Sequence, residues 1–220
     1  MMTKRHNFDA SLNELRKELI DMGGKVERAI HLSVESLKAG NLALAREVIA
    51  GDAELNAMEE RIDDIGTRLI ATQQPVAKDL RRIIIAFRMA SDLERMADLA
   101  VDVAKVTLRI GEEPLIKPLV DIPRMAEIAR QMTIDSIEAY VREDVDLAYR
   151  MAKMDDDVDQ LHSQIMRELF GFMVENPRTV NQSLLLCFVS RYLERMADHA
   201  TNIGESVVYL VTGKRPDLNA

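Results

Sequence analysis

The six residues LERMAD occur twice in this chain of 220 residues, at Leu93–Asp98 and again, letter for letter, at Leu193–Asp198. Both copies lie in stretches where apolar side chains recur with the spacing of an α-helix. An independent match lies upstream at a shift of 103 residues, where Leu44-Ala45 corresponds to Leu147-Ala148. We therefore predict two copies of one helical unit that differ by three residues in length between their second and third helices.

Gly, Pro and Asn residues divide each copy into three long segments. The expected helices span about 8–39, 42–73 and 78–110 in the first copy, and about 121–142, 145–174 and 179–213 in the second. Thr179 followed by Gln182 resembles a capping box, and the proline-containing stretch Gly111–Pro118 is typical of a linker. This pattern predicts an all-α fold of two tandem, pseudo-symmetric three-helix bundles, with domains at residues 1–113 and 114–220.

The composition excludes several classes of protein. The chain has 9 Gly, 6 Pro, no Trp and 4% aromatic residues, so strand and turn formers are scarce and an all-β fold is excluded. Its 29 basic and 37 acidic residues give a net charge of −8. A general nucleic-acid binder needs a basic surface that displaces counterions from phosphates, so we expect no nucleic-acid partner.

The single cysteine and the apolar runs bear on the cellular compartment. Cys187 lies in the apolar run Leu184–Val189, and we interpret its thiol as a small core side chain rather than a nucleophile. One cysteine excludes a disulfide within the chain and is typical of a reducing cytoplasm. The segment Met1–Asp9 lacks the apolar region of a signal peptide, and no apolar run approaches the ~18 residues of a membrane span. We expect a soluble, cytoplasmic protein.

Acidic side chains recur at intervals of four residues on the third helix of each copy, opposite a stripe of alanines, and the second helices carry further oxygen ligands. The candidate metal ligands are Asp52, Asn56, Glu94, Asp98 and Asp102 in the first copy, and Asp155, Asp159, Glu194, Asp198 and Asn202 in the second. Like charges at this spacing repel each other, and a multivalent cation would relieve the repulsion. The residues alone leave open whether these faces bind metal or are simply solvated.

Other polar residues are interpreted more plainly. We expect the charged run Glu59–Asp64 to be solvated surface, and Asp155–Asp157 to be an acidic cluster at a helix N-terminus. His162 and His199 are weaker candidates for metal ligands. The Glu-x-x-His motif of di-iron bundles is absent, and so are phosphate-binding loops and nucleophile elbows. We therefore expect no catalytic residues and no organic cofactor, and a binding or regulatory protein rather than an enzyme.

Three stretches carry a family resemblance: Gln73–Arg81, Asp92–Ala100 and, most specifically, Leu193–Gly213. They resemble the PhoU family of phosphate-transport regulators over nearly the whole chain. The resemblance implies two pseudo-symmetric three-helix bundles and a cytoplasmic, often dimeric protein that is peripheral to the membrane. It further implies metal binding, by Fe, Mn, Mg or Zn, at Glu/Asp-x-x-x-Asp motifs. Asn56 stands where Asp159 does, and Asn202 where Asp102 does, so the copies need not bind metal equally.

The resemblance also implies partners. A PhoU-like protein is expected to restrain phosphate uptake and phosphate-regulon signalling, as an adaptor between the ATPase subunit of the phosphate ABC transporter and a sensor histidine kinase. Two alternatives remain open at this point: an accessory protein of a different phosphate-uptake system and, less in keeping with the missing motifs, a metal-dependent hydrolase.

Overall fold

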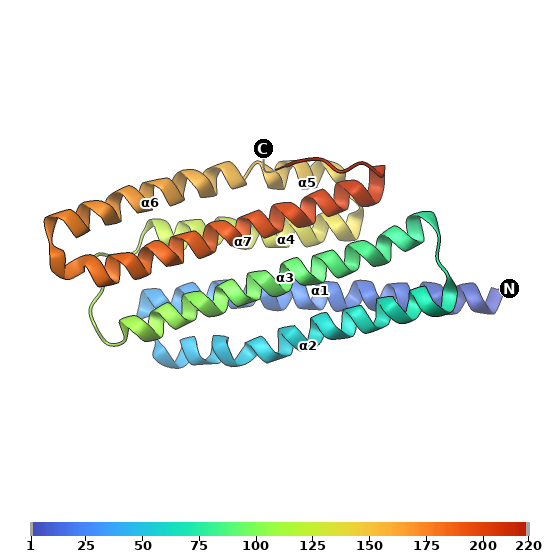
Figure 1. The fold of residues 1–220 in the computed structure, drawn as a ribbon, viewed down its shortest axis with the longest axis horizontal. Helices are drawn as coiled ribbons and strands as arrows, with labels where there is room; N and C mark the ends of the chain where they lie inside the picture. The colour runs from blue at the N-terminus through green and yellow to red at the C-terminus, as the bar shows by residue number, and fades with distance from the viewer. Residues whose placement is uncertain (1, 219–220) are drawn as a thin grey trace.

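The computed structural model describes the backbone of residues 2–218 and the side chains of residues 8–218, and Figure 1 shows the described chain as an elongated bundle of helices. The described residues form seven α-helices and one short 3-10 turn. In chain order these are α1 (Met2–Ala39), α2 (Leu42–Gln73), α3 (Ala77–Ile110), α4 (Asp121–Arg142), α5 (Val145–Ala152), α6 (Asp155–Glu175), η1 (Pro177–Thr179) and α7 (Val180–Thr212).

The predicted six long helices are present, and the fifth is interrupted once. The chain turns at Lys153–Met154 and resumes as α6, so α5 and α6 together correspond to α2 of the first repeat. Asp155, Asp156 and Asp157 occupy the first turn of α6, which confirms the prediction of an acidic helix N-terminus there. Negative side chains are favourable at this end because the helix dipole is positive.

The predicted capping box at the start of the last helix is wrong. The Thr179 hydroxyl donates to the backbone carbonyl oxygens of Phe172 and Asn176, at 2.9 and 2.8 Å, and makes no cap hydrogen bond to α7. The turn η1 causes this difference, because it places Thr179 against the end of α6. Gln182 is used elsewhere, since its side chain binds the backbone of the linker between the repeats.

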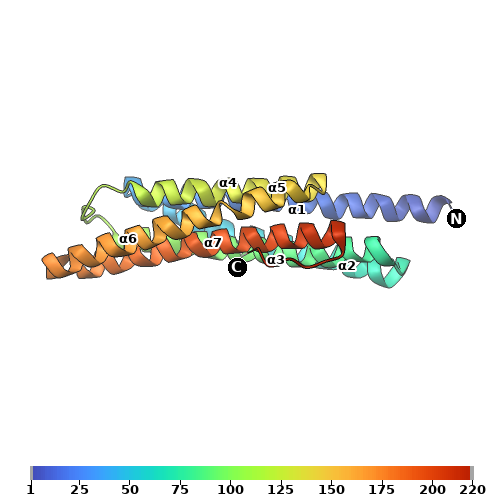
Figure 2. The same ribbon diagram turned by 90° about the horizontal axis from the view of Figure 1, so that it is seen from above.

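One hydrophobic core runs through both repeats. In the first repeat α1, α2 and α3 contact one another, and in the second repeat α4, α7 and the interrupted helix α5–α6 do the same. Between the repeats, α3 packs along α7 and α1 packs along α4 (Figures 1 and 2). The apolar positions of the repeated hexapeptide, Leu93 and Met96 with their counterparts Leu193 and Met196, are fully buried in this core. The apolar stripe that the duplicated sequence predicted is therefore buried in the core of the bundle.

Equivalent residues of the two repeats meet between α1 and α4. Glu27 and Arg130, which are 103 residues apart, form an ion pair with each other, and Arg130 also binds Glu127. The separation equals the shift that relates the two repeats, so this pair lies on the pseudo-two-fold axis. Close by, a Cβ atom at Gly23 would lie 2.8 Å from Cγ1 of Ile137, so the glycine allows α4 to approach α1.

The repeats fill one position of their cores differently. In the first repeat a Cβ atom at Gly66 would lie only 2.2 Å from Cε1 of Phe87, so the ring occupies the space of a side chain. The second repeat has Leu169 and Cys187 at the corresponding positions, and both are buried. The lone cysteine therefore stands where the first repeat has a phenylalanine.

A membrane-crossing helix is not found in the described part of the chain, since none is long and apolar enough.

Candidate functional site

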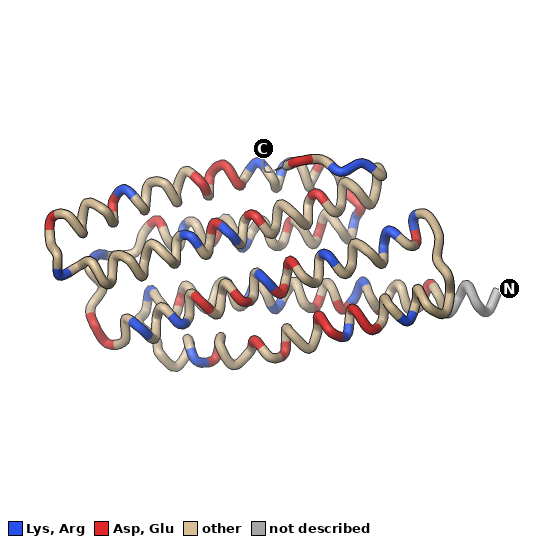
Figure 3. The backbone as a smooth tube through the Cα atoms, viewed as in Figure 1, with Lys and Arg blue, Asp and Glu red and all other residues tan. Residues whose placement is uncertain are grey.

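Two acidic clusters lie on corresponding helix pairs of the two repeats (Figure 3). The first acidic cluster, between α2 and α3, comprises Asp52, Asn56, Glu59, Glu94 and Asp98. The second acidic cluster, between α6 and α7, comprises Asp155, Asp159, His162, Glu194 and Asp198. Eight of these ten residues are predicted ligands and His162 is a weaker candidate, and carboxylates from the two helices of each pair lie close enough to influence one another's pKa.

In the first acidic cluster, carboxylates repel one another but also find partners. Burial, and then the neighbouring Asp98 carboxylate, raise the pKa of Glu94. Arg95 lies 3.4 Å from Glu94 and 3.2 Å from Asp98, and it counteracts part of this repulsion. The Asn56 amide donates a hydrogen bond to Oδ2 of Asp52 at 3.3 Å. One of the five side chains of this cluster is therefore uncharged.

The second acidic cluster is more deeply buried and more strongly perturbed. Burial raises the pKa of Asp155 to about 7, with further contributions from the charges of Asp198, Asp159 and Glu194. Burial and the Asp198 charge also raise the pKa of Glu194, whose side chain is only 12% exposed. Asp155 therefore retains its proton at a pH where ordinary carboxyl groups are ionised.

Three buried carboxylate oxygens in the clusters have no hydrogen-bond partner: Oδ1 of Asp52, Oδ1 of Asp155 and Oε2 of Glu194. Asp52 and Asp155 are equivalent positions, so the same unpartnered oxygen occurs in both repeats. Leaving a buried acceptor unpaired is costly, and native proteins usually give it a partner. Oxygen ligands of this kind suit hard cations.

Two predicted ligands lie at the edges of these clusters. Asp102 pairs with Lys105 at 2.9 Å. Asn202 faces α3, where its amide donates to Oδ1 of Asp92 at 3.5 Å. The rotation of the helix explains both positions, because each step of four residues turns a side chain by about 40°, so two steps turn it by about 80°.

Glu59 is a cluster residue that the sequence interpretation assigned to solvated surface. Burial and the charges of Asp63 and Asp98 raise its pKa, while the charge of Arg95 counteracts part of this rise. The signal that would have found it is its correspondence, at a shift of 103 residues, with His162. Nδ1 of His162 lies 2.8 Å from Oγ of Ser190. His199 instead forms an inter-repeat contact, with its Nδ1 at 2.9 Å from Oδ1 of Asp92.

Among the described residues, no group of three or more His, Cys, Asp or Glu side chains has an arrangement that could hold a metal ion. The clusters thus supply suitable donors, several of them unpartnered, without a closed ligand sphere.

Comparison with known proteins decides the family. The PhoU domain family matches residues 19–107 and 122–207, once in each repeat. The chain belongs to the PhoU family. The two matches begin 103 residues apart and end 100 residues apart, as the two sequence shifts require.

Relatives and solved structures agree with this family. The phosphate-specific transport system accessory protein PhoU homolog of Clostridium acetobutylicum is 41% identical over 98% of this chain and 99% of its own length. PhoU of Escherichia coli is 33% identical over 94% of this chain and 86% of its own length. The crystal structure of PhoU from Pseudomonas aeruginosa superposes with a TM-score of 0.91 at 36% identity, covering 94% of this chain and all of that one. The two curated relatives are named accessory proteins of a phosphate-specific transport system, in agreement with the prediction of a regulatory protein rather than an enzyme.

Proposed function

We propose that this chain is an accessory protein of a phosphate-specific transport system that restrains phosphate uptake and phosphate-regulon signalling. The observation that supports the proposal is the match of both repeats to the PhoU domain family, and of nearly the full length to relatives named accessory proteins of a phosphate-specific transport system. The protein would act in the cytoplasm as an adaptor, contacting the ATPase subunit of the phosphate ABC transporter and a sensor histidine kinase, and it would assemble as a homodimer. Its location at the membrane would depend on these partners.

The acidic clusters would bind metal ions in this role. The unpartnered oxygens of Asp52, Asp155 and Glu194, together with the raised pKa values of the second acidic cluster, support cation binding. Asp98, Asp159, Asp198 and Glu94 would complete the donor sets, with Asn56 as a neutral ligand and Asp102 and Asn202 at the edges. A bound Fe, Mn, Mg or Zn ion would offset the repulsion between carboxylates and hold the two helices of each pair together.

One set of substitutions tests the metal sites. Replacing Glu94, Asp98, Glu194 and Asp198 together by Ala should remove bound metal, as measured by elemental analysis, and should preserve helicity in circular dichroism. The matched control replaces four exposed carboxylates outside the clusters, Glu60, Asp64, Glu112 and Glu113, and should leave the metal content unchanged. Equal metal content in both variants would reject the site assignment.

A second experiment tests the partners. The tagged chain should capture the transporter ATPase and the histidine kinase from cells grown at high phosphate, and deletion of its gene should raise phosphate uptake. Unchanged uptake in the deletion strain would refute the accessory role.

A further inference from the structure

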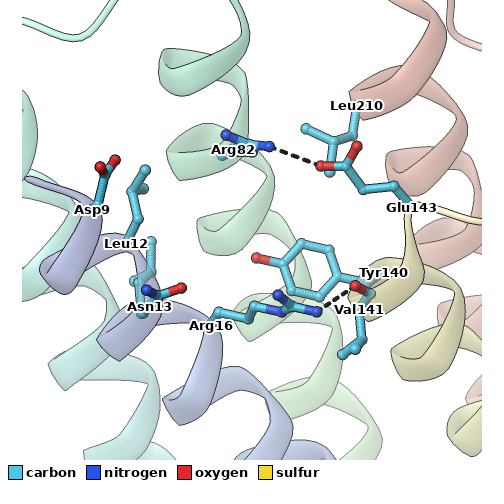
Figure 4. A pocket seen from close by; sticks show the side chains of 10 residues that line it. Asp9, Leu12, Asn13, Arg16, Arg82, Tyr140, Val141, Glu143 and Leu210 are labelled. Atoms are coloured by element: carbon cyan, nitrogen blue, oxygen red, sulfur yellow. Dashed lines mark hydrogen bonds and ion pairs between the residues drawn. The ribbon is translucent and has the colours of Figure 1, made fainter.

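A cavity of about 300 Å³ lies where α1, α3, α4 and α7 meet, far from both acidic clusters. Two guanidinium groups, Arg16 on α1 and Arg82 on α3, line it together with the phenol of Tyr140 (Figure 4). Residues from both repeats therefore form its wall. Its volume is at the lower end of the range for ligand pockets, which indicates a small ligand.

The inner wall of the cavity is rich in hydrogen-bond donors. Arg16 donates to the backbone carbonyl oxygen of Val141, in the last turn of α4, so a helix end rather than a carboxylate holds this guanidinium in place. The Tyr140 side chain is almost fully buried, and Figure 4 shows its hydroxyl directed into the cavity beside Arg16. Burial raises the pKa of Tyr140 to about 12, so the phenol keeps its proton and can donate it.

Two carboxylates also face this cavity, and their surroundings differ. Glu143 is neutralised by two cations, with its oxygens 2.6 Å from Nζ of Lys78 and 3.0 Å from Nη2 of Arg82. Asp9 is exposed at the mouth. A carboxylate accepts hydrogen bonds but cannot donate one. An anion that carries no proton can therefore make no hydrogen bond with these carboxylates, whereas an anion that retains a proton can donate a hydrogen bond to one of them.

The fold itself does not require this charge. At the opposite end of the molecule, the repeat symmetry places Leu119, Leu37, Gly40 and Gln182 at the positions of Arg16, Tyr140, Glu143 and Arg82. That end is closed by the inter-repeat linker, because Gln182 accepts from the backbone N–H of Ile116 at 2.6 Å and donates to the carbonyl oxygen of Pro114 at 3.2 Å. Equivalent packing is thus achieved there with an apolar, covered surface.

We propose that this cavity binds a small, protonated oxyanion, hydrogen phosphate, between the guanidinium of Arg16 and the hydroxyl of Tyr140. Arg82, which is ion-paired with Glu143 and Asp79, would lie beside the ligand, and a carboxylate would accept a hydrogen bond from the proton that the ligand retains. The chemistry favours phosphate over sulfate, since phosphate retains a proton at neutral pH and sulfate does not. This inference rests on the proposed role in phosphate transport, to which it adds a direct contact with the transported ion. Because the cavity wall joins both repeats, bound phosphate would tie them together.

Calorimetric titration of the full-length protein with inorganic phosphate tests the site. We expect saturable binding that falls at least thirtyfold in Arg16→Gln and about tenfold in Tyr140→Phe, which removes a single hydroxyl from the cavity. Matched controls outside the cavity, Arg46→Gln and Tyr149→Phe, replace exposed residues and should bind as the parent does. Phosphate binding that persists undiminished in Tyr140→Phe, with helicity intact, would overturn the site.

A second arm uses sulfate at the same ionic strength, and we expect binding at least tenfold weaker than that of phosphate. Equal affinity for the two anions would refute selection by the carboxylates. Phosphate uptake in cells separates this inference from the accessory role. If the parent chain restrains uptake but binds no phosphate, the cavity proposal fails and the accessory role stands. Binding of phosphate without any effect on uptake would mean the reverse.

Discussion

The two acidic clusters are built on the same helical frame, yet they differ in donors and burial. The first contains the neutral amide Asn56, the carboxylate Glu59 and a nearby Arg95 that pairs with two of its carboxylates, whereas in the second Arg191 pairs with Glu194. In the second cluster, Asp159 stands at the position of Asn56 and His162 at the position of Glu59. The pKa of its Asp155 is raised to about 7. Duplication therefore preserved the place of an acidic cluster, while substitutions of single residues changed its charge and the types of side chain that it contains.

The cores of the repeats teach the same lesson for packing. Gly66 and Phe87 in the first repeat, and Leu169 and Cys187 in the second, distribute side-chain volume differently over equivalent positions. A small residue beside a large one is exchanged for two of intermediate size. Cores tolerate such changes when the total volume is kept.

The largest expected effect comes from breaking this exchange. Gly66→Leu forces a side chain into the ring of Phe87 and should lower the free energy of unfolding by about 3 kcal/mol, as measured by urea denaturation. Adding Phe87→Cys recreates the pair of the second repeat and should restore at least half of the loss. A double variant no more stable than Gly66→Leu alone would show that the two positions are not coupled.

The next effect separates the two clusters by their metal preference. Glu194→Ala with Asp198→Ala should lower Zn²⁺ affinity tenfold to a hundredfold, because the second acidic cluster contains an imidazole, which suits Zn²⁺. The counterpart, Glu94→Ala with Asp98→Ala, should lower Mn²⁺ affinity more than Zn²⁺ affinity, since its donors are all oxygen. Titration of each variant with each ion checks this, and identical losses for both ions would remove the distinction.

A smaller effect concerns the dependence of stability on pH in the metal-free protein. The pKa of Asp155 is about 7 in the folded state and 3.8 as its ordinary value, so the native state binds the proton more tightly and stability falls as pH rises from about 4 to 7. Asp155→Asn should remove this cost and raise the free energy of unfolding by about 1–2 kcal/mol at pH 8, after allowance for solvent screening. At pH 4 the difference from the parent should vanish.

The counterpart substitution is the control for this measurement. Asp52→Asn makes the same replacement at the equivalent position of the first repeat, beside the neutral Asn56, and shows what the substitution itself does to stability. A gain in Asp155→Asn that is the same at pH 4 and pH 8 would contradict an origin in ionisation.

The smallest effect exchanges one ligand between the clusters. Glu59→His gives the first acidic cluster the imidazole of the second, and should raise its Zn²⁺ affinity relative to Mn²⁺ by a few-fold. The reciprocal change, His162→Glu, should shift the preference of the second acidic cluster in the opposite direction. Competition between the two ions measures both shifts, and an unchanged ratio would exclude these side chains as ligands.

Much of the fold follows from the sequence because the repeated hexapeptide combines a helical apolar stripe with a fixed spacing. The break at Lys153–Met154 could not be predicted in this way, since neither residue is a Gly or Pro. Helical spacing was sufficient to predict most side chains of the acidic clusters. It was not sufficient for Asn202, whose side chain points toward α3 because of the rotation of the helix. Glu59 was missed because a charged run on a helix surface has the same appearance whether or not another helix covers it.

The ion pair between Glu27 and Arg130 has a consequence for assembly. Two identical first halves, docked as the halves of this chain are docked, would bring one Glu27 carboxylate against another, and two second halves would oppose their Arg130 guanidiniums. Because the charges at these equivalent positions are opposite, each half pairs less favourably with a second copy of itself than with the other half. A fragment that contains only one repeat should therefore associate poorly with a second copy of itself through this helix. In the full chain, the covalent connection keeps the two different repeats paired.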